Sequence, residues 1–268
     1  MRLKDWLKDN RQFFLERDLR YLIKNTFAPQ SWHIFDEEVD AAGVEYLQSV
    51  TASYMKGFPM PYLLGKEDFF GLEFKVNPSV LIPRKETELI VEKALEILRR
   101  GQCRSVLDLG CGSGNIAVTI KKTIPWARVT ASDCDEKALE IAQCNVSFHD
   151  VHVTFARSDV FSGFQKASFD MIVTNPPYVD ADDMTSELSY EPRTALVAGD
   201  KGFSMIERIL NEAHNYLRPQ GYLLIEMGYN HKELVYNKCV QSGMYSIIEW
   251  IKDYDGNWRG AVMQVKKQ

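Results

Sequence analysis

The sequence lacks several features that mark particular classes of protein. No apolar run approaches the roughly 20 residues that cross a bilayer, and the first residues carry no signal-peptide core, so we expect a cytoplasmic protein without a membrane segment. The five cysteines are odd in number and form no C-x-x-C pair, which favours reduced thiols over a disulfide framework. Neither the cysteines nor the five histidines show the spacing of metal ligands, and no metal is expected.

An excess of positive charge is also missing. The 268 residues carry a formal net charge of −5, with a pI near 5.6, so bulk attraction to nucleic acid is absent and no direct nucleic-acid partner is expected. The hydrophobic share of 45% and the charged share of 26% are those of an ordinary globular chain. This length suits one large or two modest domains, and we expect a monomer.

Three regions differ in composition. Apolar residues recur at helical spacing up to about residue 60, which predicts a small helical domain (1–60) with Asp40 as a helix cap. Residues 61–86 are punctuated by Gly and Pro yet rich in Phe, Leu and Tyr, which indicates a structured connector. Within it, 72–76 and 80–82 predict a hairpin. The remainder, 87–268, alternates strands with helices and predicts an α/β domain with a doubly wound parallel sheet.

The elements that we expect in this last region follow its hydrophobic pattern. The predicted strands are 105–109, 128–132, 151–156, 169–174, 222–227, 245–251 and 261–265, the last two antiparallel across a turn at 255–257. The predicted helices are 88–100, 115–123, 136–145, 202–217 and 232–242.

One predicted strand runs into Asn175-Pro176-Pro177-Tyr178. The prolines supply no N–H group and keep the preceding residues out of the helical region, so the turn is stiff and its carbonyls are free. The carboxyl ends of parallel strands are where open α/β sheets bind ligands. There the Asn175 oxygen and the Pro176 carbonyl can accept both N–H bonds of a planar amino group, while the Tyr178 ring covers its face. The alternative is a rigid loop that only ends the strand.

A glycine-rich turn follows the first strand of the same domain. Glycines at 110, 112 and 114 let the backbone approach a ligand closely. The third glycine comes one position earlier than in a nicotinamide dinucleotide site. Asp108 precedes the loop, where a carboxylate suits an ammonium group or a cation better than a pyrophosphate. No Gly-Lys-Ser/Thr is present, which excludes a P-loop.

Two more carboxylates end the next strands. Asp133 can accept both hydroxyls of a ribose, and Asp159 lies where an adenine amino group could donate to it, although either can instead be a solvent-facing residue at a strand end. An ammonium, a ribose and an adenine without phosphates describe S-adenosylmethionine, with S-adenosylhomocysteine as its product. The expected cofactor-binding residues are Asp108, Gly110, Cys111, Gly112, Ser113, Gly114, Asp133, Asp159, Val160 and Asn175.

Together these motifs resemble class I S-adenosylmethionine methyltransferases that modify planar exocyclic nitrogens. Other segments look like the peptide chain release factor glutamine methyltransferases: Pro61-Tyr62-Leu63-Leu64-Gly65, Leu81-Ile82-Pro83-Arg84 before Glu86-Thr87-Glu88, Glu191-Pro192, and Glu226-Met227-Gly228. The likeness covers roughly residues 60 to 265. It departs from the family pattern at Lys85, where Pro is often found, and at His231, where Gln is frequent.

The resemblance implies a fold and an activity. The implied fold is a seven-stranded, Rossmann-like catalytic domain preceded by a helical, substrate-recognising domain and a hairpin connector. The implied reaction moves a methyl group from S-adenosylmethionine to the side-chain amide nitrogen of the glutamine in the Gly-Gly-Gln motif of class 1 release factors, in support of translation termination. The implied catalytic residues are Asn175, Pro176 and Tyr178, and the implied substrate-binding residues are these three with Pro177 and Arg84.

Three other functions stay open at this point. A sister enzyme that methylates a glutamine of a ribosomal protein has the same chemistry, but it usually departs from the Leu-Ile-Pro-Arg-x-Glu-Thr-Glu form. A DNA amino-methyltransferase is expected to carry a target-recognition domain and a basic cleft, which this acidic chain does not show. A non-catalytic module could use the fold to grip a release factor, against which the intact glycine loop and Asn175 argue.

Overall fold

The computed structural model describes residues 1–27, 38–101 and 103–267. They divide into two compact units. One unit is Met1–Lys66 with Thr185–Tyr190, and the other is Glu67–Met184 with Glu191–Gln268. Among the helices of the described residues, none combines the length and the apolarity needed to span a membrane.

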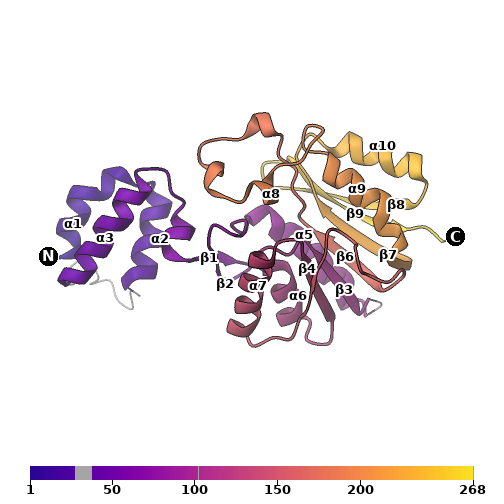
Figure 1. The fold of residues 1–268 in the computed structure, drawn as a ribbon, viewed down its shortest axis with the longest axis horizontal. Helices are drawn as coiled ribbons and strands as arrows, with labels where there is room; N and C mark the ends of the chain where they lie inside the picture. The colour runs from indigo at the N-terminus through magenta and orange to yellow at the C-terminus, as the bar shows by residue number, and fades with distance from the viewer. Residues whose placement is uncertain (28–37, 102, 268) are drawn as a thin grey trace. The chain divides into compact units, whose positions relative to one another are not determined.

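The first unit is helical, as predicted. Its helices are α1 (Leu3–Asn10), α2 (Glu16–Phe27), α3 (Ala41–Tyr54) and α4 (Met60–Leu64), with short 3-10 turns at Arg11–Phe13 and Leu188–Tyr190 (Figure 1). The Asp40 side chain caps α3 by accepting from the Gly43 N–H, which confirms the predicted cap. Each helix buries one apolar stripe, and Leu3, Leu22 and Leu47 meet in the core.

A two-stranded hairpin, β1 (Lys66–Phe69) and β2 (Leu72–Lys75), starts earlier in the chain than the sequence indicates. The hairpin predicted over 72–76 and 80–82 is therefore wrong. Its turn is Phe70-Gly71, with both residues at positive φ (52° and 73°). A bulky residue seldom adopts this conformation, so Phe70 gives no turn signal in the sequence.

The larger unit contains a seven-stranded sheet in the order β5-β4-β3-β6-β7-β9-β8. Its first five strands in this order are parallel, and β9 pairs antiparallel with both β7 and β8. This confirms the predicted doubly wound α/β sheet with an antiparallel terminal hairpin. The strands are β3 (Ser105–Leu109), β4 (Arg128–Asp133), β5 (Thr154–Arg157), β6 (Phe169–Thr174), β7 (Leu217–Glu226), β8 (Tyr245–Lys252) and β9 (Trp258–Val265).

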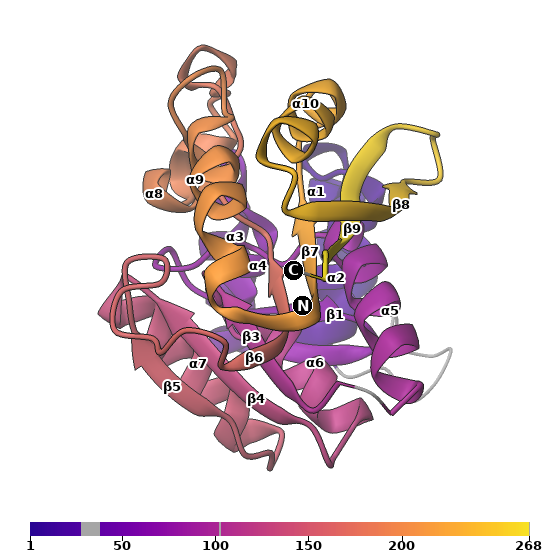
Figure 2. The same ribbon diagram turned by 90° about the vertical axis from the view of Figure 1, so that its right-hand side faces the viewer.

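Helices cover both faces of this sheet (Figure 2). One face packs against α5 (Lys85–Arg99), α6 (Asn115–Thr123) and α7 (Glu136–Phe148), and the other against α9 (Ser204–Glu212) and α10 (Lys232–Ser242). Successive strand residues point to opposite faces, so Val106 lies in the core beside α5 and Leu107 in the core beside α9. Shorter helical turns are Ala181–Asp183, α8 (Arg193–Leu196) and Ala213–Asn215.

The two boundaries that differ most from the predicted ones do so for physical reasons. Helix α9 ends at Glu212 rather than near 217, and β7 then begins at Leu217 rather than 222. Pro219 and Gly221 interrupt the apolar pattern of β7, and the pairing with β6 is irregular between Phe169 and Met171. The early part of this strand is therefore hidden from a periodicity argument.

The strand order creates a crevice beside β3. The chain leaves β3 toward β4 and β5 on one side and returns to β6 on the other, and ligands bind at such a switch point. The Thr174 hydroxyl donates to the Leu109 carbonyl at 2.7 Å, which holds together the carboxyl ends of β6 and β3. The loops that follow these two strands therefore start from fixed, adjacent positions.

Asn145 of α7 ties the hairpin to the glycine-rich loop. The side chain is fully buried. Its oxygen accepts from the Lys75 N–H at 2.8 Å, and its NH2 group donates to the carbonyls of Lys75 at 3.0 Å and Ser113 at 2.8 Å. One side chain thus satisfies three backbone groups on two segments that are far apart in the sequence.

Replacing Asn145 by Ala removes all three bonds and leaves the backbone groups without these partners. We expect the free energy of unfolding to fall by about 2 kcal/mol or more in urea denaturation. The exposed Gln143 on the same helix provides a matched control, and Gln143→Ala should change it by less than about 0.5 kcal/mol. Equal losses in the two variants would show that Asn145 does not anchor these segments.

Candidate functional site

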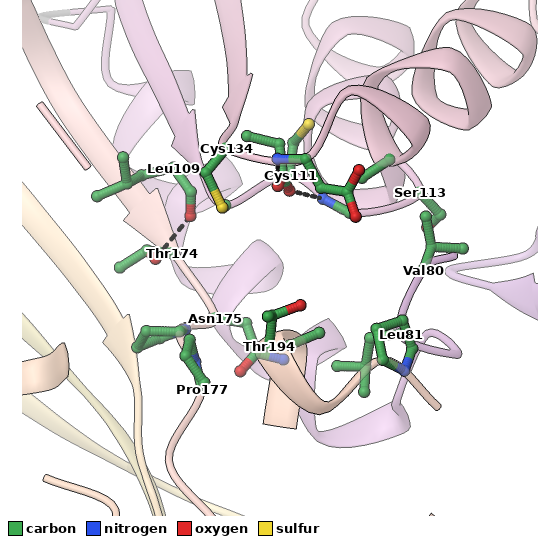
Figure 3. A pocket seen from close by; sticks show the side chains of 18 of the residues that line it. Val80, Leu81, Leu109, Cys111, Ser113, Cys134, Thr174, Asn175, Pro177 and Thr194 are labelled. Carbon is green, nitrogen blue, oxygen red and sulfur yellow. Dashed lines mark hydrogen bonds between the residues drawn. The ribbon is translucent and has the colours of Figure 1, made fainter. Parts of the chain in front are cut away.

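One cavity of the larger unit opens at the carboxyl ends of four parallel strands. It is lined by residues 109–113, 133–135, 158–160 and 174–177, which follow β3, β4, β5 and β6. The other lining residues are Ser79, Val80, Leu81, Pro83, Arg84, Thr87, Asn115, Ile116, Ala138, Pro192, Thr194, Ala195, Met205 and Ile209. Figure 3 shows Asn175 and Pro177 across the cavity from Cys111 and Ser113. The structure therefore brings most of the predicted site residues into one place.

The glycine-rich loop is fixed by bonds to the end of β4. The N–H groups of Gly110 and Cys111 both donate to the Ser132 carbonyl at 2.8 Å, and the Gly112 N–H donates to the Asp133 carboxylate at 2.9 Å. Gly110 and Gly112 have positive φ, and a Cβ added at either would meet open space. This bare backbone is a cradle against which a ligand can lie closely.

Gly114 and Cys111 have different surroundings. A Cβ at Gly114 would lie 3.1 Å from the Ala142 Cβ, and Gly114 is outside the cavity wall, so it permits α6 to pack closely on α7. Cys111 lines the cavity, and burial raises the pKa of its thiol, with Asp108 and Asp133 adding to the rise. This thiol is therefore neutral at ordinary pH and is a small wall residue rather than a nucleophile.

Asp108 lies behind the cavity wall and is completely buried. One carboxylate oxygen accepts from the Ala117 N–H at 2.9 Å in the first turn of α6. The other oxygen has no hydrogen-bond partner among the described residues. Burial raises the pKa of Asp108 to about 7; the Ala117 bond opposes this rise, and the nearby Asp133 charge adds to it. A buried carboxylate oxygen without a partner is a strong acceptor for a cationic group.

Asp133 and Asp159 both line the cavity, with different partners. The two Asp133 oxygens accept from the N–H groups of Gly112 and Asp135 at 2.9 and 3.0 Å, and each keeps a lone pair for a hydroxyl. Both Asp159 oxygens accept from the Arg208 guanidinium at 2.8 and 3.1 Å, which lowers the pKa of Asp159. An adenine amino group would have to share this carboxylate with Arg208.

The opposite wall presents two free acceptors. The Asn175 NH2 group donates to the Thr87 hydroxyl at 3.0 Å. Within the part of the chain that the structure describes, no hydrogen bond reaches the Asn175 side-chain oxygen or the Pro176 carbonyl. Both residues and Pro177 line the cavity. This is the pair of acceptors that a planar NH2 group requires.

Tyr178 lies outside the cavity wall, and its hydroxyl donates to Glu226 at 2.9 Å. The covering of a substrate by its ring stays a prediction. Glu226 also accepts from the Thr87 hydroxyl at 2.7 Å. Sequence reasoning gives Thr87 and Glu226 no role; the available signal is an acid at the end of the apolar strand β7. Burial raises the pKa of Glu226 to about 7, while the hydrogen bonds from Thr87 and Tyr178 oppose the rise.

Arg84 lines the cavity, but its guanidinium forms an ion pair with Glu191. Glu191 is buried and also accepts from the Ile82 N–H at 3.0 Å. This carboxylate therefore fastens residues 79–84 to residues 191–195, two parts of the same wall. The role of Arg84 in binding a substrate stays a prediction, and the structure shows that part of its charge is already neutralised.

The two positions that depart from the family pattern have structural partners. Lys85 pairs with Glu88 at 2.8 Å on the first turns of α5. His231 is buried, and its Nε2 donates to the Lys201 carbonyl at 3.1 Å. Across residues 1–27, 38–101 and 103–267, no group of three or more His, Cys, Asp or Glu side chains is placed to hold a metal ion.

The chain is similar to known methyltransferases. Residues 85–243 match the family model described as "Methyltransferase small domain". The release factor glutamine methyltransferase of Geobacter sulfurreducens is 37% identical over 213 residues, which cover 78% of this chain and 74% of that protein. The enzyme of the same name from Salmonella typhimurium is 40% identical over 208 residues, which cover 76% and 74%.

A solved structure supports the fold alone. The crystal structure of a methyltransferase from Pyrococcus furiosus superposes with a TM-score of 0.54 at 19% identity and covers 85% of this chain and all of that one. The sequence relatives are far more similar, and they align over most of both chains. With the glycine loop, the acidic strand ends and the paired acceptors in one cavity, the chain belongs to the release factor glutamine methyltransferases.

Proposed function

We propose that this enzyme transfers a methyl group from S-adenosylmethionine to the side-chain amide nitrogen of the Gly-Gly-Gln glutamine in class 1 release factors. The observation that carries the proposal is the pair of free acceptors, Asn175 Oδ1 and the Pro176 carbonyl, opposite the glycine-rich cradle. The names of the relatives favour this substrate over a ribosomal protein or DNA.

The residues at the cradle fit S-adenosylmethionine, which supplies an electrophilic methyl group on a sulfonium when bound. The unpartnered buried oxygen of Asp108 suits the ammonium group, and the remaining lone pairs of Asp133 suit the ribose hydroxyls. The open space above Gly110 and Gly112 leaves room for the cofactor against the backbone. Asp159 and Val160 are the proposed contacts of the adenine.

Asn175 and Pro176 are proposed to act by positioning. A glutamine amide nitrogen is a poor nucleophile because its lone pair is delocalised into the carbonyl. Acceptors that hold both of its N–H bonds orient the nitrogen toward the methyl group and favour the positive charge that builds on it. The amide proton can leave after transfer, and the proposal assigns no general base.

We also propose a role for each of the three regions of the chain. The helical domain (1–60) would recognise the release factor, the connector (61–86) would lead into the catalytic domain (87–268), and the enzyme would act as a cytoplasmic monomer. The described helical unit offers a folded surface for this recognition.

Methyl transfer tests the substrate and the role of Asn175 together. The protein is mixed with labelled S-adenosylmethionine and, in parallel, an unmodified class 1 release factor, a ribosomal protein and double-stranded DNA, and mass spectrometry locates the methyl. We expect one methyl on the Gly-Gly-Gln glutamine. Asn175→Ala should lower kcat on the order of 10²-fold while the cofactor Kd holds. Methyl on another acceptor alone would overturn the substrate, and a parallel loss of cofactor affinity would overturn the role of Asn175.

Asp133 should matter for the cofactor and not for the acceptor. Asp133→Asn keeps an oxygen that can accept from Gly112, but an NH2 group replaces the oxygen that accepts from the Asp135 N–H and would accept from the ribose. We expect the Kd of S-adenosylmethionine to rise about 10–100-fold in calorimetric titration, the effect of losing a hydrogen bond to a charged group. Asp150→Asn makes the same charge change at an exposed site and should leave the Kd as it was. An unchanged Kd for Asp133→Asn would remove this residue from the ribose.

Asp108 should lower stability at high pH. Its pKa in the folded state, about 7, lies above the usual value near 3.9. The folded protein therefore binds more protons between these values, and the stability contributed at low pH is lost as the pH rises through about 7. Asp108→Asn should raise the thermal midpoint at about pH 8, raise it less at about pH 5, change it least below about pH 4, and abolish most of the stabilisation by S-adenosylmethionine. An equal rise of the midpoint on adding the cofactor to both proteins would contradict this role.

A further inference from the structure

We infer that Glu226, acting through Thr87, determines which side of the Asn175 carboxamide faces the cavity, and thereby makes the site an acceptor of N–H groups. Glu226 and Thr87 are then positioning residues for the reaction. The catalytic role of these two residues rests on the proposed function, but the orientation of the Asn175 carboxamide can be measured without any substrate.

Two hydroxyl groups form hydrogen bonds with the Glu226 carboxylate. The Thr87 hydroxyl lies 2.7 Å from one carboxylate oxygen, and the Tyr178 hydroxyl lies 2.9 Å from the other. An ionised carboxylate has no proton and can only accept. Both hydroxyls must therefore donate to Glu226, and each has one proton to give.

The hydrogen bond to Glu226 determines what the Thr87 oxygen can do toward Asn175. Because its proton points at Glu226, the Thr87 oxygen can only accept from Asn175, which lies 3.0 Å away. Asn175 must then turn its NH2 group toward Thr87, and its oxygen is left for the cavity. The reversed carboxamide would place two oxygens together without a proton between them and would present donors to the NH2 group of a substrate.

An acid at this position has no structural advantage over a neutral residue. Glu226 is completely buried, and an uncharged residue of similar size would avoid the desolvation of a carboxylate. The charged and titratable groups that face it are Glu86 from α5, Arg259 from β9 and Tyr178. Glu86 opposes its ionisation and Arg259 favours it. An acceptor-only group is what imposes one direction on the chain of hydrogen bonds, and this explains the acid.

Protonation should release this control. A protonated Glu226 can donate to Thr87, and Thr87 can then give its own proton to the Asn175 oxygen. The carboxamide turns, and its NH2 group faces the cavity. The one covalent change is the O–H bond formed at Glu226, and its proton comes from solvent. The rate at saturating cofactor should therefore fall as the pH falls through the pKa of Glu226, about 7.

The kinetic test uses the full chain, saturating S-adenosylmethionine and an unmodified class 1 release factor. Glu226→Gln can both donate and accept, so it should lower kcat on the order of 10²-fold and remove the acid limb of the pH profile, with an unchanged cofactor Kd. Thr87→Val should show the same loss of kcat, and Thr87→Ser, which keeps the hydroxyl, should recover the rate. Glu233→Gln, the same change at an exposed site, is the control. A wild-type rate or an intact acid limb in Glu226→Gln would overturn the inference.

A second measurement separates this inference from the proposed function. The side-chain NH2 signals of Asn175 are followed by NMR against pH without substrate, and are assigned by their absence in Asn175→Ala. We expect a titration with a midpoint near the pKa of Glu226 in the wild type and none in Glu226→Gln. This result would hold even if the wild type methylated no release factor, in which case only the proposed function fails. Signals that ignore pH, or titrate equally in both proteins, would overturn the inference itself.

Discussion

The pairing of β3 with β6 is the constraint on which the site depends. Leu109 stands beside Thr174 in this parallel register, and the Thr174 hydroxyl bonds to the Leu109 carbonyl at 2.7 Å. The glycine loop begins one residue after the first, and Asn175 one residue after the second. A slip of one residue would turn every side chain of β6 to the other face and move Asn175 away from the cradle. The backbone hydrogen bonds between β3 and β6 therefore align the two halves of the cavity, whatever conformation the loops adopt.

Two buried carboxyl groups stand at the ends of strands in this unit, and both have a pKa near 7 because of burial. Asp108, behind the cradle, leaves one oxygen without a partner, whereas Glu226, behind Asn175, has both oxygens occupied by hydroxyl donors. The first suits a positive group that arrives with a ligand, and the second suits the fixing of neighbouring side chains. Burying each of these two carboxyl groups lowers the stability of the folded protein, which is usual for titratable groups at functional sites.

Local patterns predicted the parts of the fold that depend on local physics. The apolar run before Asn175-Pro176 predicted β6 with its correct bounds, and Asp40 predicted a cap, because both signals lie within a few residues. The hairpin was misplaced because its turn uses Phe70 at positive φ. The contacts between Thr87 and Glu226, and between Arg84 and Glu191, join residues more than a hundred positions apart. No periodicity or spacing rule relates such pairs, so the partners of the site residues required the structure.

The chemistry of the cavity follows from the direction of its hydrogen bonds more than from its residue types. An asparagine can offer a donor or an acceptor, and the same wall could in principle suit a carbonyl as well as an amine. The carboxylate of Glu226 removes this choice, since each hydroxyl that donates to it can no longer donate elsewhere. The Pro176 carbonyl adds a second group that can only accept, and the two prolines limit the conformations of the turn that carries it. Two acceptors in one wall match a group with two N–H bonds, whereas a hydroxyl has one O–H bond and would leave an acceptor unpaired in a partly buried site. We therefore infer that a preference for an amide nitrogen depends on the directions of the hydrogen bonds behind the wall, which start at Glu226, a residue outside the cavity lining.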